Sequence, residues 1–194
     1  MSGRYGPGTW NYSPFARAMH WLMAALVIFQ IAAGLIMTAD VPESSVLGRI
    51  SAALSLYDLH KLLGMLLLLL IFVRIGYRVI AGAPDDEPTL EPWQKEASHF
   101  THAWIYLLLI VLPLVGWIGI SLYPAVVALG IKIPAILPPD RKASVIAFAI
   151  HTYAAFVLIA LIAMHVGAAL YHHVIRKDGV LVRMLPGLRR LDDR

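Results

Sequence analysis

The sequence predicts an all-α integral membrane protein, a four-helix bundle with both termini in the cytoplasm. Its composition is 59% hydrophobic and only 14% charged, with a mean hydropathy of +0.72. A soluble domain carries more charge, because its surface must face water. The apolar residues also fall in four long blocks, each with the ~20 residues that a membrane-spanning helix needs. We therefore expect residues 1–194 to form a single membrane domain.

The four expected spans cover residues about 15–37, 57–79, 99–123 and 145–174. The first follows a polar stretch, Met1 to Phe15, which lacks the short apolar region and cleavage site of a signal peptide, so we expect no cleaved signal. The second contains the uninterrupted apolar run Leu62–Val73. The third is too long and apolar to be dismissed, so an odd number of spans is not expected. The fourth is the longest.

The connections between the spans are polar or rich in proline. Residues 38–56 are expected to form a short loop. Residues 82–96 contain three prolines and five acidic residues, and residues 124–142 contain four prolines. Within the latter, residues 126–136 are apolar but too short to span, so we expect them to lie at the membrane interface.

Loop charges predict the orientation of the bundle, because cytoplasmic loops of membrane proteins carry an excess of lysine and arginine. Eleven of the sixteen lysines and arginines fall on the side of the two termini, which is therefore expected to be cytoplasmic. The five on the other side are Arg49, Lys61, Lys132, Arg141 and Lys142. The net charge of +4 is explained by these flanking residues, so no nucleic-acid partner is expected.

The chain contains no cysteine. This excludes disulfides, iron–sulfur clusters, thiolate-ligated haem and covalently attached c-type haem. Any haem must be bound non-covalently.

Eight histidines are the strongest functional signal, because ionisable side chains inside a membrane are costly and usually mark function. With the N-terminus inside, His20 enters the membrane near the cytoplasmic face, and His60 and His151 lie near the outer face. His165 lies 14 residues after His151, about 21 Å deeper and within about 40° of the same helix face. Depth therefore pairs His60 with His151 outside, and His20 with His165 inside.

Two histidines on facing helices are what an iron with two axial imidazole ligands requires. The two pairs of histidines thus predict two b-type haems, one near each face of the membrane. A zinc ion would instead need a tetrahedral cluster at one depth. Arg17 and Arg74 lie near the inner pair and are candidates to pair with haem propionates, or they serve only as positive-inside anchors.

The remaining histidines and several glycines are weaker signals. His99 and His102 are expected as interfacial residues at the cytoplasmic start of the third helix, with a place near a haem propionate or a quinone as the alternative. His172 and His173 are expected as solvated interface residues. Three glycines lie near the four histidines and either admit a flat macrocycle or serve ordinary helix packing: Gly34, Gly64 and Gly167.

The chain resembles the prokaryotic cytochrome b561 family, including its superoxide-oxidising members, over nearly its whole length. The matching stretches are Ala18-Met-His-Trp21, Leu59-His-Lys-Leu-Leu-Gly64 running on to Arg74, His99-Phe-Thr-His102 with Tyr106, Leu112-Pro-Leu-Val-Gly116, and Met164-His-Val-Gly-Ala-Ala-Leu-Tyr-His-His173 continuing to Arg183-Met-Leu-Pro186. The resemblance implies a four-helix bundle in the bacterial inner membrane, haem ligation by the same four histidines, and electron exchange with membrane quinone. The match is weakest at the outer loop, residues 124–143, where a substrate would be recognised.

The favoured hypothesis is a di-haem oxidoreductase that passes electrons from an outer donor, superoxide by resemblance, to ubiquinone. Positive residues on the outer side would steer a small anion: Lys61, Arg141 and Lys142, with Arg49. The same residues would equally serve haem propionates or lipid phosphates. Two alternatives stay open: a cytochrome subunit anchoring a dehydrogenase or hydrogenase, and a haem-free transporter or structural membrane protein. The sequence leaves the oligomeric state open, a homo-oligomer included.

Overall fold

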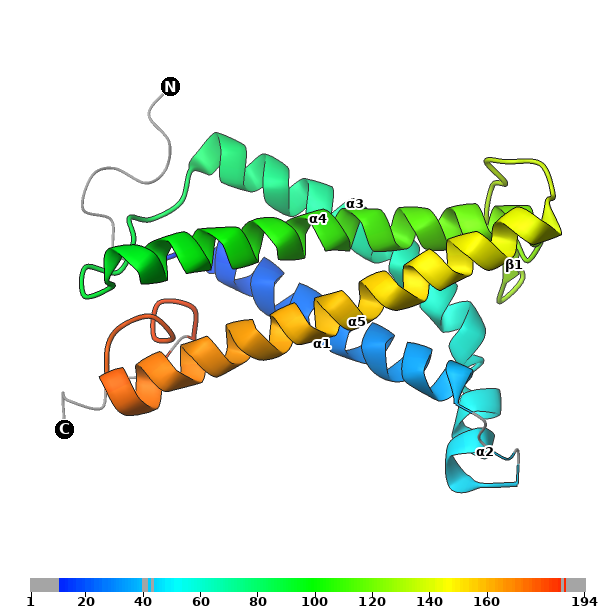
Figure 1. Ribbon diagram of the computed structural model, residues 1–194, viewed down its shortest axis with the longest axis horizontal. Helices are drawn as coiled ribbons and strands as arrows, with labels where there is room; N and C mark the ends of the chain where they lie inside the picture. The colour runs from blue at the N-terminus through cyan, green and yellow to red at the C-terminus, as the bar shows by residue number, and fades with distance from the viewer. Residues whose placement is uncertain (1–10, 40–41, 43, 186, 188–194) are drawn as a thin grey trace.

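The computed structural model describes residues 11–39, 42, 44–185 and 187, and four long helices dominate it (Figure 1). These are α1 (Pro14–Thr38), α3 (Leu56–Ala81), α4 (Pro92–Leu122) and α5 (Arg141–Tyr171). Each is long and apolar enough to cross a membrane, which confirms the predicted all-α membrane fold. The cytoplasmic location of the termini stays a prediction, and the terms inner and outer refer to that predicted orientation. Arg4, Arg189, Arg190 and Arg194, and the first ten residues on which the signal-peptide expectation rested, lie outside the described residues.

The helix starts are fixed by local capping groups. Ser13 caps α1 by accepting a hydrogen bond from the Ala16 amide. Asp140 does the same for α5, accepting from the amides of Lys142 and Ala143. The expected start of the third helix at residue 99 was seven residues late, because Glu91 and Gln94 form a capping box with Pro92 at the first turn.

Three further elements depart from the expected loops. The connection 38–56 is not a plain loop, since it contains helix α2 (Val46–Ala53), whose N-terminus is capped by Ser45. The apolar stretch 126–136 holds a hairpin of β1 (Val127–Ala128) and β2 (Ile131–Lys132). Beyond Tyr171, α5 continues as a π-helical turn, η1 (His172–Arg176). The position of the hairpin at the membrane interface stays a prediction.

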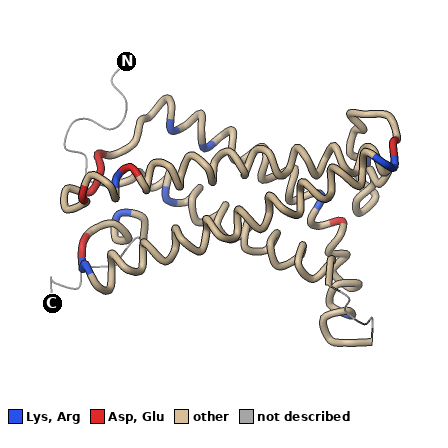
Figure 2. The backbone as a smooth tube through the Cα atoms, viewed as in Figure 1, with Lys and Arg blue, Asp and Glu red and all other residues tan. Residues whose placement is uncertain are grey.

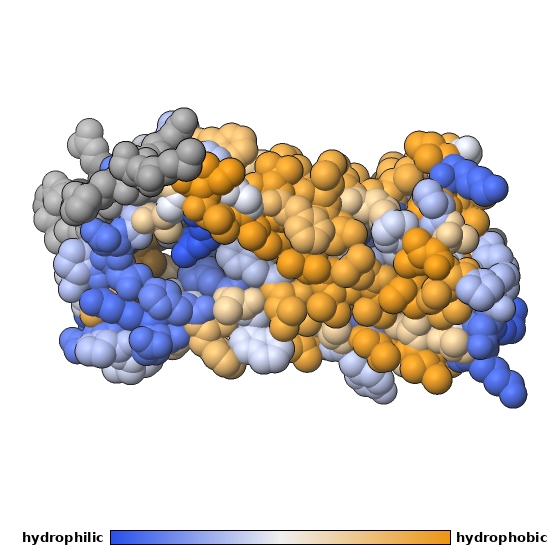
Figure 3. All heavy atoms as spheres, turned by 90° about the horizontal axis from the view of Figure 1, so that it is seen from above, coloured by the Kyte–Doolittle hydropathy of each residue, from blue (hydrophilic) through white to orange (hydrophobic). Residues whose placement is uncertain are grey.

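The long helices place the connections at two opposite ends of the bundle. The start of α1, the end of α5 and the connection between α3 and α4 lie at one end, and α2 and the hairpin lie at the other (Figure 1). Charged residues are concentrated towards these ends (Figure 2), and an apolar belt covers the middle of the visible face (Figure 3). Sorting of this kind is what a lipid bilayer requires of the surface that it contacts.

The helices associate in two close pairs. α4 packs extensively against α5, and α1 against α3, while α3 joins the pairs through α4. By contrast, α5 makes at most sparse close backbone contact with α1 or α3 along the described residues. The apolar core lies at mid-bundle and is built from all four helices: Met23, Val27, Leu67, Leu68, Ile71, Leu108, Leu112 and Leu158.

Candidate functional site

The outer candidate site is formed by His60 of α3 and His151 of α5, whose rings meet edge-on with centroids 6.0 Å apart and an interplanar angle of 72°. His151 Nδ1 lies 3.0 Å from the main-chain oxygen of Leu112 on α4. Because a carbonyl oxygen only accepts, Nδ1 of His151 carries the proton, and its Nε2 has a free lone pair. A metal-ligating imidazole has this arrangement.

Two glycines give the outer imidazoles room. A Cβ placed on Gly34 of α1 would lie 3.5 Å from His60 Cε1. A Cβ on Gly116 of α4 would lie 3.3 Å from both Cε1 and Nδ1 of His151. Gly34 therefore lies against the ring of His60, and its expected place beside a macrocycle stays a prediction. Gly167 has no neighbour within 4 Å of an added Cβ.

The inner candidate site is formed by His20 of α1 and His165 of α5, with ring centroids 6.2 Å apart at an angle of 70°. A third ring, that of His102 on α4, lies 5.1 Å from His165. His102 also has its Nδ1 3.2 Å from Ser98 Oγ. Among the described residues, the inner site therefore brings three imidazoles together where the outer site brings two.

The spacing of the rings tests whether these pairs fit an iron between them. A metal–imidazole bond is about 2 Å and the ring centre lies about 1 Å beyond the nitrogen, so two imidazoles on opposite sides of one metal have centres about 6 Å apart. The outer pair at 6.0 Å and the inner pair at 6.2 Å both fit. His102 and His165, at 5.1 Å, are too close for this arrangement. These are the two pairs matched by depth, and ligation by them stays a prediction.

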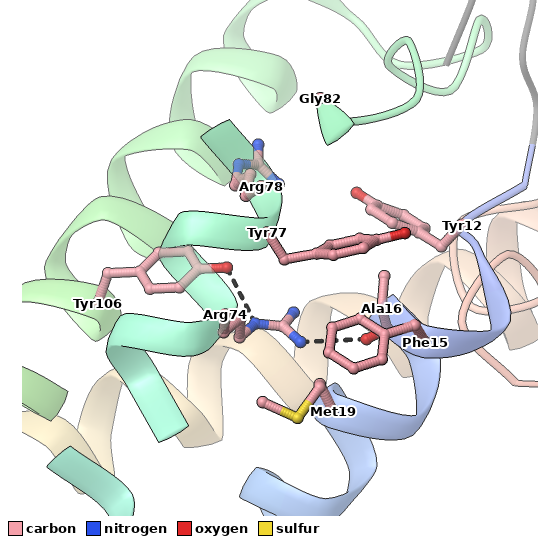
Figure 4. Close-up of a pocket in the computed structure, with 9 residues that line it drawn as sticks. All are labelled: Tyr12, Phe15, Ala16, Met19, Arg74, Tyr77, Arg78, Gly82 and Tyr106. Atoms are coloured by element: carbon pink, nitrogen blue, oxygen red, sulfur yellow. Dashed lines mark hydrogen bonds between the residues drawn. The ribbon is translucent and has the colours of Figure 1, made fainter. Parts of the chain in front are cut away.

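Arg17 and Arg74 both lie at the inner end, as expected from the sequence. Arg17, one turn before His20, has a buried Nε for which the described residues provide no hydrogen-bond partner. Arg74 lines a small cavity between α1, α3 and α4, donating to the main-chain oxygen of Ala16 and to the Tyr106 hydroxyl (Figure 4). A buried guanidinium nitrogen that lacks an acceptor suits an anionic group such as a haem propionate.

The outer cations are less free than the sequence suggested. Lys61 pairs with Asp58 at 2.8 Å, so its charge is neutralised. Its ammonium group also donates to the main-chain oxygen of Val127, and this hydrogen bond holds the hairpin on α3. Arg141 lies over the Tyr123 ring at 5.0 Å and is exposed. Lys142 and Arg49 are also exposed at this end. Of the predicted steering group, Lys61 is therefore the least available to a solute.

The other histidines have roles that the sequence did not resolve. His172 is buried and lies 2.6 Å from Asp178, so the expectation of a solvated interface residue was wrong for it. The π-helical turn directs its ring inwards rather than to solvent. His173 is partly buried, and the described residues provide no partner for its Nδ1. His99 of α4 has its Nε2 3.1 Å from Oδ1 of Asp86, which lies in the connection before α4.

The sequence did not predict the surroundings of two residues near the sites. His102 was expected at a helix start, but the early start of α4 carries it three turns into the helix and against His165. Gln30 of α1 was not singled out, although a glutamine within an apolar span is itself a sign of a specific interaction. It donates from Nε2 to the main-chain oxygen of His60 at 2.9 Å.

Comparisons with known proteins agree with this arrangement. A family model described as prokaryotic cytochrome b561 matches residues 11–187. The chain is 32% identical over 185 residues to cytochrome b561 homolog 2 of Escherichia coli K12, covering 90% of this chain and 91% of that protein. It is 30% identical over 186 residues to a probable superoxide oxidase CybB of Yersinia pestis (92% and 98% covered), and 27% identical over 178 residues to cytochrome b562 of Cereibacter sphaeroides (90% and 95% covered). The chain belongs to the prokaryotic cytochrome b561 family and is a multi-pass, haem b-binding electron-transfer protein of the bacterial inner membrane.

Proposed function

We propose that this chain, as a single membrane domain, binds two haem b groups and transfers electrons between superoxide at the outer face and ubiquinone in the membrane. The observation that carries the proposal is the presence of two histidine pairs, each spaced by about 6 Å as one metal requires. Each pair bridges helices whose backbones make little close contact, α5 with α1 or with α3. Ordinary helix packing gives no reason for such costly side chains at both depths.

In this proposal, His60 and His151 hold the outer haem, and His20 and His165 hold the inner one. Bound between two histidines, haem b supplies one-electron transfer and offers no open coordination position. The Leu112 carbonyl fixes the His151 tautomer and thereby aims its Nε2 away from α4. Gly34 and Gly116 let the rings approach the neighbouring helices closely.

The arginines at the inner end have a separate task. Arg17 presents its partly buried guanidinium near His20, and Arg74 is held in place by Ala16 and Tyr106. Both are proposed to neutralise haem propionates, because carboxylates and guanidinium groups pair in bidentate hydrogen bonds. Positive-inside anchoring alone does not require Arg74 to be fixed by two specific acceptors.

Superoxide as the donor is supported by the relative named as a probable superoxide oxidase and by the exposed cations of the outer end. Two superoxide anions would each lose one electron to become dioxygen, and one ubiquinone would take up both electrons with two protons to become ubiquinol. Arg141 and Lys142 would raise the encounter rate by attracting the anion. Lys61 contributes less to this attraction, because Asp58 neutralises it.

The test is the rate at which purified protein reduces a ubiquinone analogue when superoxide is supplied. We expect a rate that falls as ionic strength rises and that drops several-fold in Arg141→Gln, since steering of an anion is screened by salt. Lys61→Gln should have a smaller effect. A rate that is independent of salt and unchanged in Arg141→Gln would contradict the steering. Absence of superoxide-driven quinone reduction, together with a co-purifying dehydrogenase or hydrogenase, would favour the anchoring-subunit alternative.

A further inference from the structure

Gln30 places a polar amide in the apolar span of α1, close to the outer histidine pair. Its side chain lies over Gly64 of α3, where an added Cβ would come within 3.3 Å of the amide nitrogen. An amide in the membrane interior is costly unless its hydrogen-bonding groups are satisfied. The close approach permitted by Gly64 and the hydrogen bond to His60 show that this amide is held in a defined place.

The orientation of the amide follows from its partner. The main-chain oxygen of His60 can only accept, so the group that faces it at 2.9 Å is the Nε2 of Gln30. The Oε1 is therefore the group left over, and it is buried with no partner among the described residues. Flipping the amide would bring two acceptors together and is excluded.

His60 also has a buried polar atom, Nδ1, that lacks a hydrogen-bond partner among the described residues. The matching nitrogen of His151 is satisfied by the Leu112 carbonyl at 3.0 Å. Buried polar groups without partners are rare in native structures, and here an acceptor and a ring nitrogen lack partners on two residues that already touch.

α1 also sets the position of the His60 ring. Gly34 lies one turn after Gln30 on the same helix face and leaves room for the imidazole edge, with an added Cβ 4.0 Å from Nδ1. One residue of α1 thus binds the His60 main chain, and a second limits where the ring can lie.

We propose that Gln30 is the positioning residue of the outer site: its Oε1 accepts the Nδ1 proton of His60, directly or through one buried water. This inference rests on the proposed ligation of haem by His60. With the proton held on Nδ1, Nε2 is the nitrogen presented to iron, and the ring orientation is fixed. An acceptor at Nδ1 also makes the imidazole a stronger donor, which favours ferric over ferrous iron and lowers the midpoint potential of that haem.

The experiment is a potentiometric titration of the two haems in the full-length protein. Gln30→Met removes the acceptor and keeps the length and shape of the side chain. We expect one midpoint potential to rise while the other is unchanged, and the shifted haem to be the one that His60→Ala removes. Gln30→Glu retains an oxygen acceptor and should leave that potential at or below its original value. Thr101→Val, which removes a hydroxyl bonded within its own helix to Ala97, is the matched control and should shift neither potential.

Each outcome decides the inference. Loss of only the His60-dependent haem in Gln30→Met would also support it, because outer-shell partners contribute about 10- to 100-fold to metal affinity. Three results in Gln30→Met would overturn the proposed role of Gln30. They are two bound haems with unchanged potentials, equal shifts of both potentials, and loss of both haems. If the unaltered protein binds no haem, the proposed function fails and not this inference alone.

Discussion

At the scale of single residues, the proposed haem binding depends on neutral imidazoles held at two depths. The cost of placing them in the membrane is offset only if each has a partner for both ring nitrogens. His151 meets this condition on one side through the Leu112 carbonyl. The opposing rings and their spacing leave the other side to a metal.

The two pairs should be separable by substitution. We expect His60→Ala and His20→Ala each to lose or alter a different haem, because each residue belongs to a different pair. Redox difference spectra with haem quantitation measure this, and His99→Ala is the control because its ring faces Asp86. Loss of the same haem in both variants would contradict the pairing.

His102 provides a sharper test of the inner pair. Because its ring lies 5.1 Å from His165, it is too close to share an iron with it in the same way as His20. We expect His102→Ala to retain both haems and to change only the spectrum or potential of the inner one. If His102→Ala loses the inner haem and His20→Ala keeps it, His102 and not His20 is the partner of His165 in that site.

A residue-scale prediction for stability comes from Gly119 of α4. An added Cβ there would lie 2.6 Å from the Phe148 ring of α5, so Gly119→Ala forces the ring or the helix to move. Overpacking of this kind costs about 1–3 kcal/mol. We expect a lower thermal unfolding midpoint. Gly76→Ala, where an added Cβ meets nothing within 4 Å, should not lower it; equal loss in both variants would contradict the packing argument.

At the scale of elements, the four spans were predictable because each is a continuous apolar block, and the largest error was the start of α4. The start of α4 depends on Glu91, Pro92 and Gln94, a capping pattern that lies in a segment dominated by prolines and acids. α2 has only eight residues, too few for a periodic pattern to stand out. The hairpin is held by contacts to α3 that are distant in sequence, as Asp58 and Leu129 show.

The hairpin provides the prediction at this scale. Asp58 accepts from the Leu129 amide at 2.9 Å and pairs with Lys61, so Asp58→Asn should loosen residues 125–132. We expect local opening to become easier by about 1 kcal/mol, about fivefold in the opening equilibrium. Limited digestion with proteinase K measures it, with Lys132→Gln on the same hairpin as control. Unchanged digestion in Asp58→Asn would show that the hairpin is held otherwise.

At the scale of the whole molecule, the sequence predicted the bundle and the two histidine pairs because depth follows directly from helix geometry. It did not predict the inward His172–Asp178 contact or the surroundings of His60. Those depend on a π-helical turn and on Gln30 reaching across from another helix. Residues on two different helices that contact each other have no fixed separation along the sequence, so such contacts cannot be predicted from spacing.

The cytoplasmic location of both termini is also a prediction at this scale. It follows from the excess of lysines and arginines on that side of the bundle. A green fluorescent protein fused after residue 194 should fluoresce, and alkaline phosphatase fused there should be inactive. Phosphatase inserted at residues 129–130 should be active. The reverse pattern would invert the assignment of the inner and outer sites.

The proposed binding of two haems by four histidines is tested most directly by redox difference spectroscopy with haem quantitation on the purified full-length protein. We expect a b-type spectrum, two haems per chain, and one haem remaining when either member of a pair is replaced. One haem per chain in the unaltered protein, or two that survive His60→Ala together with His151→Ala, would contradict it.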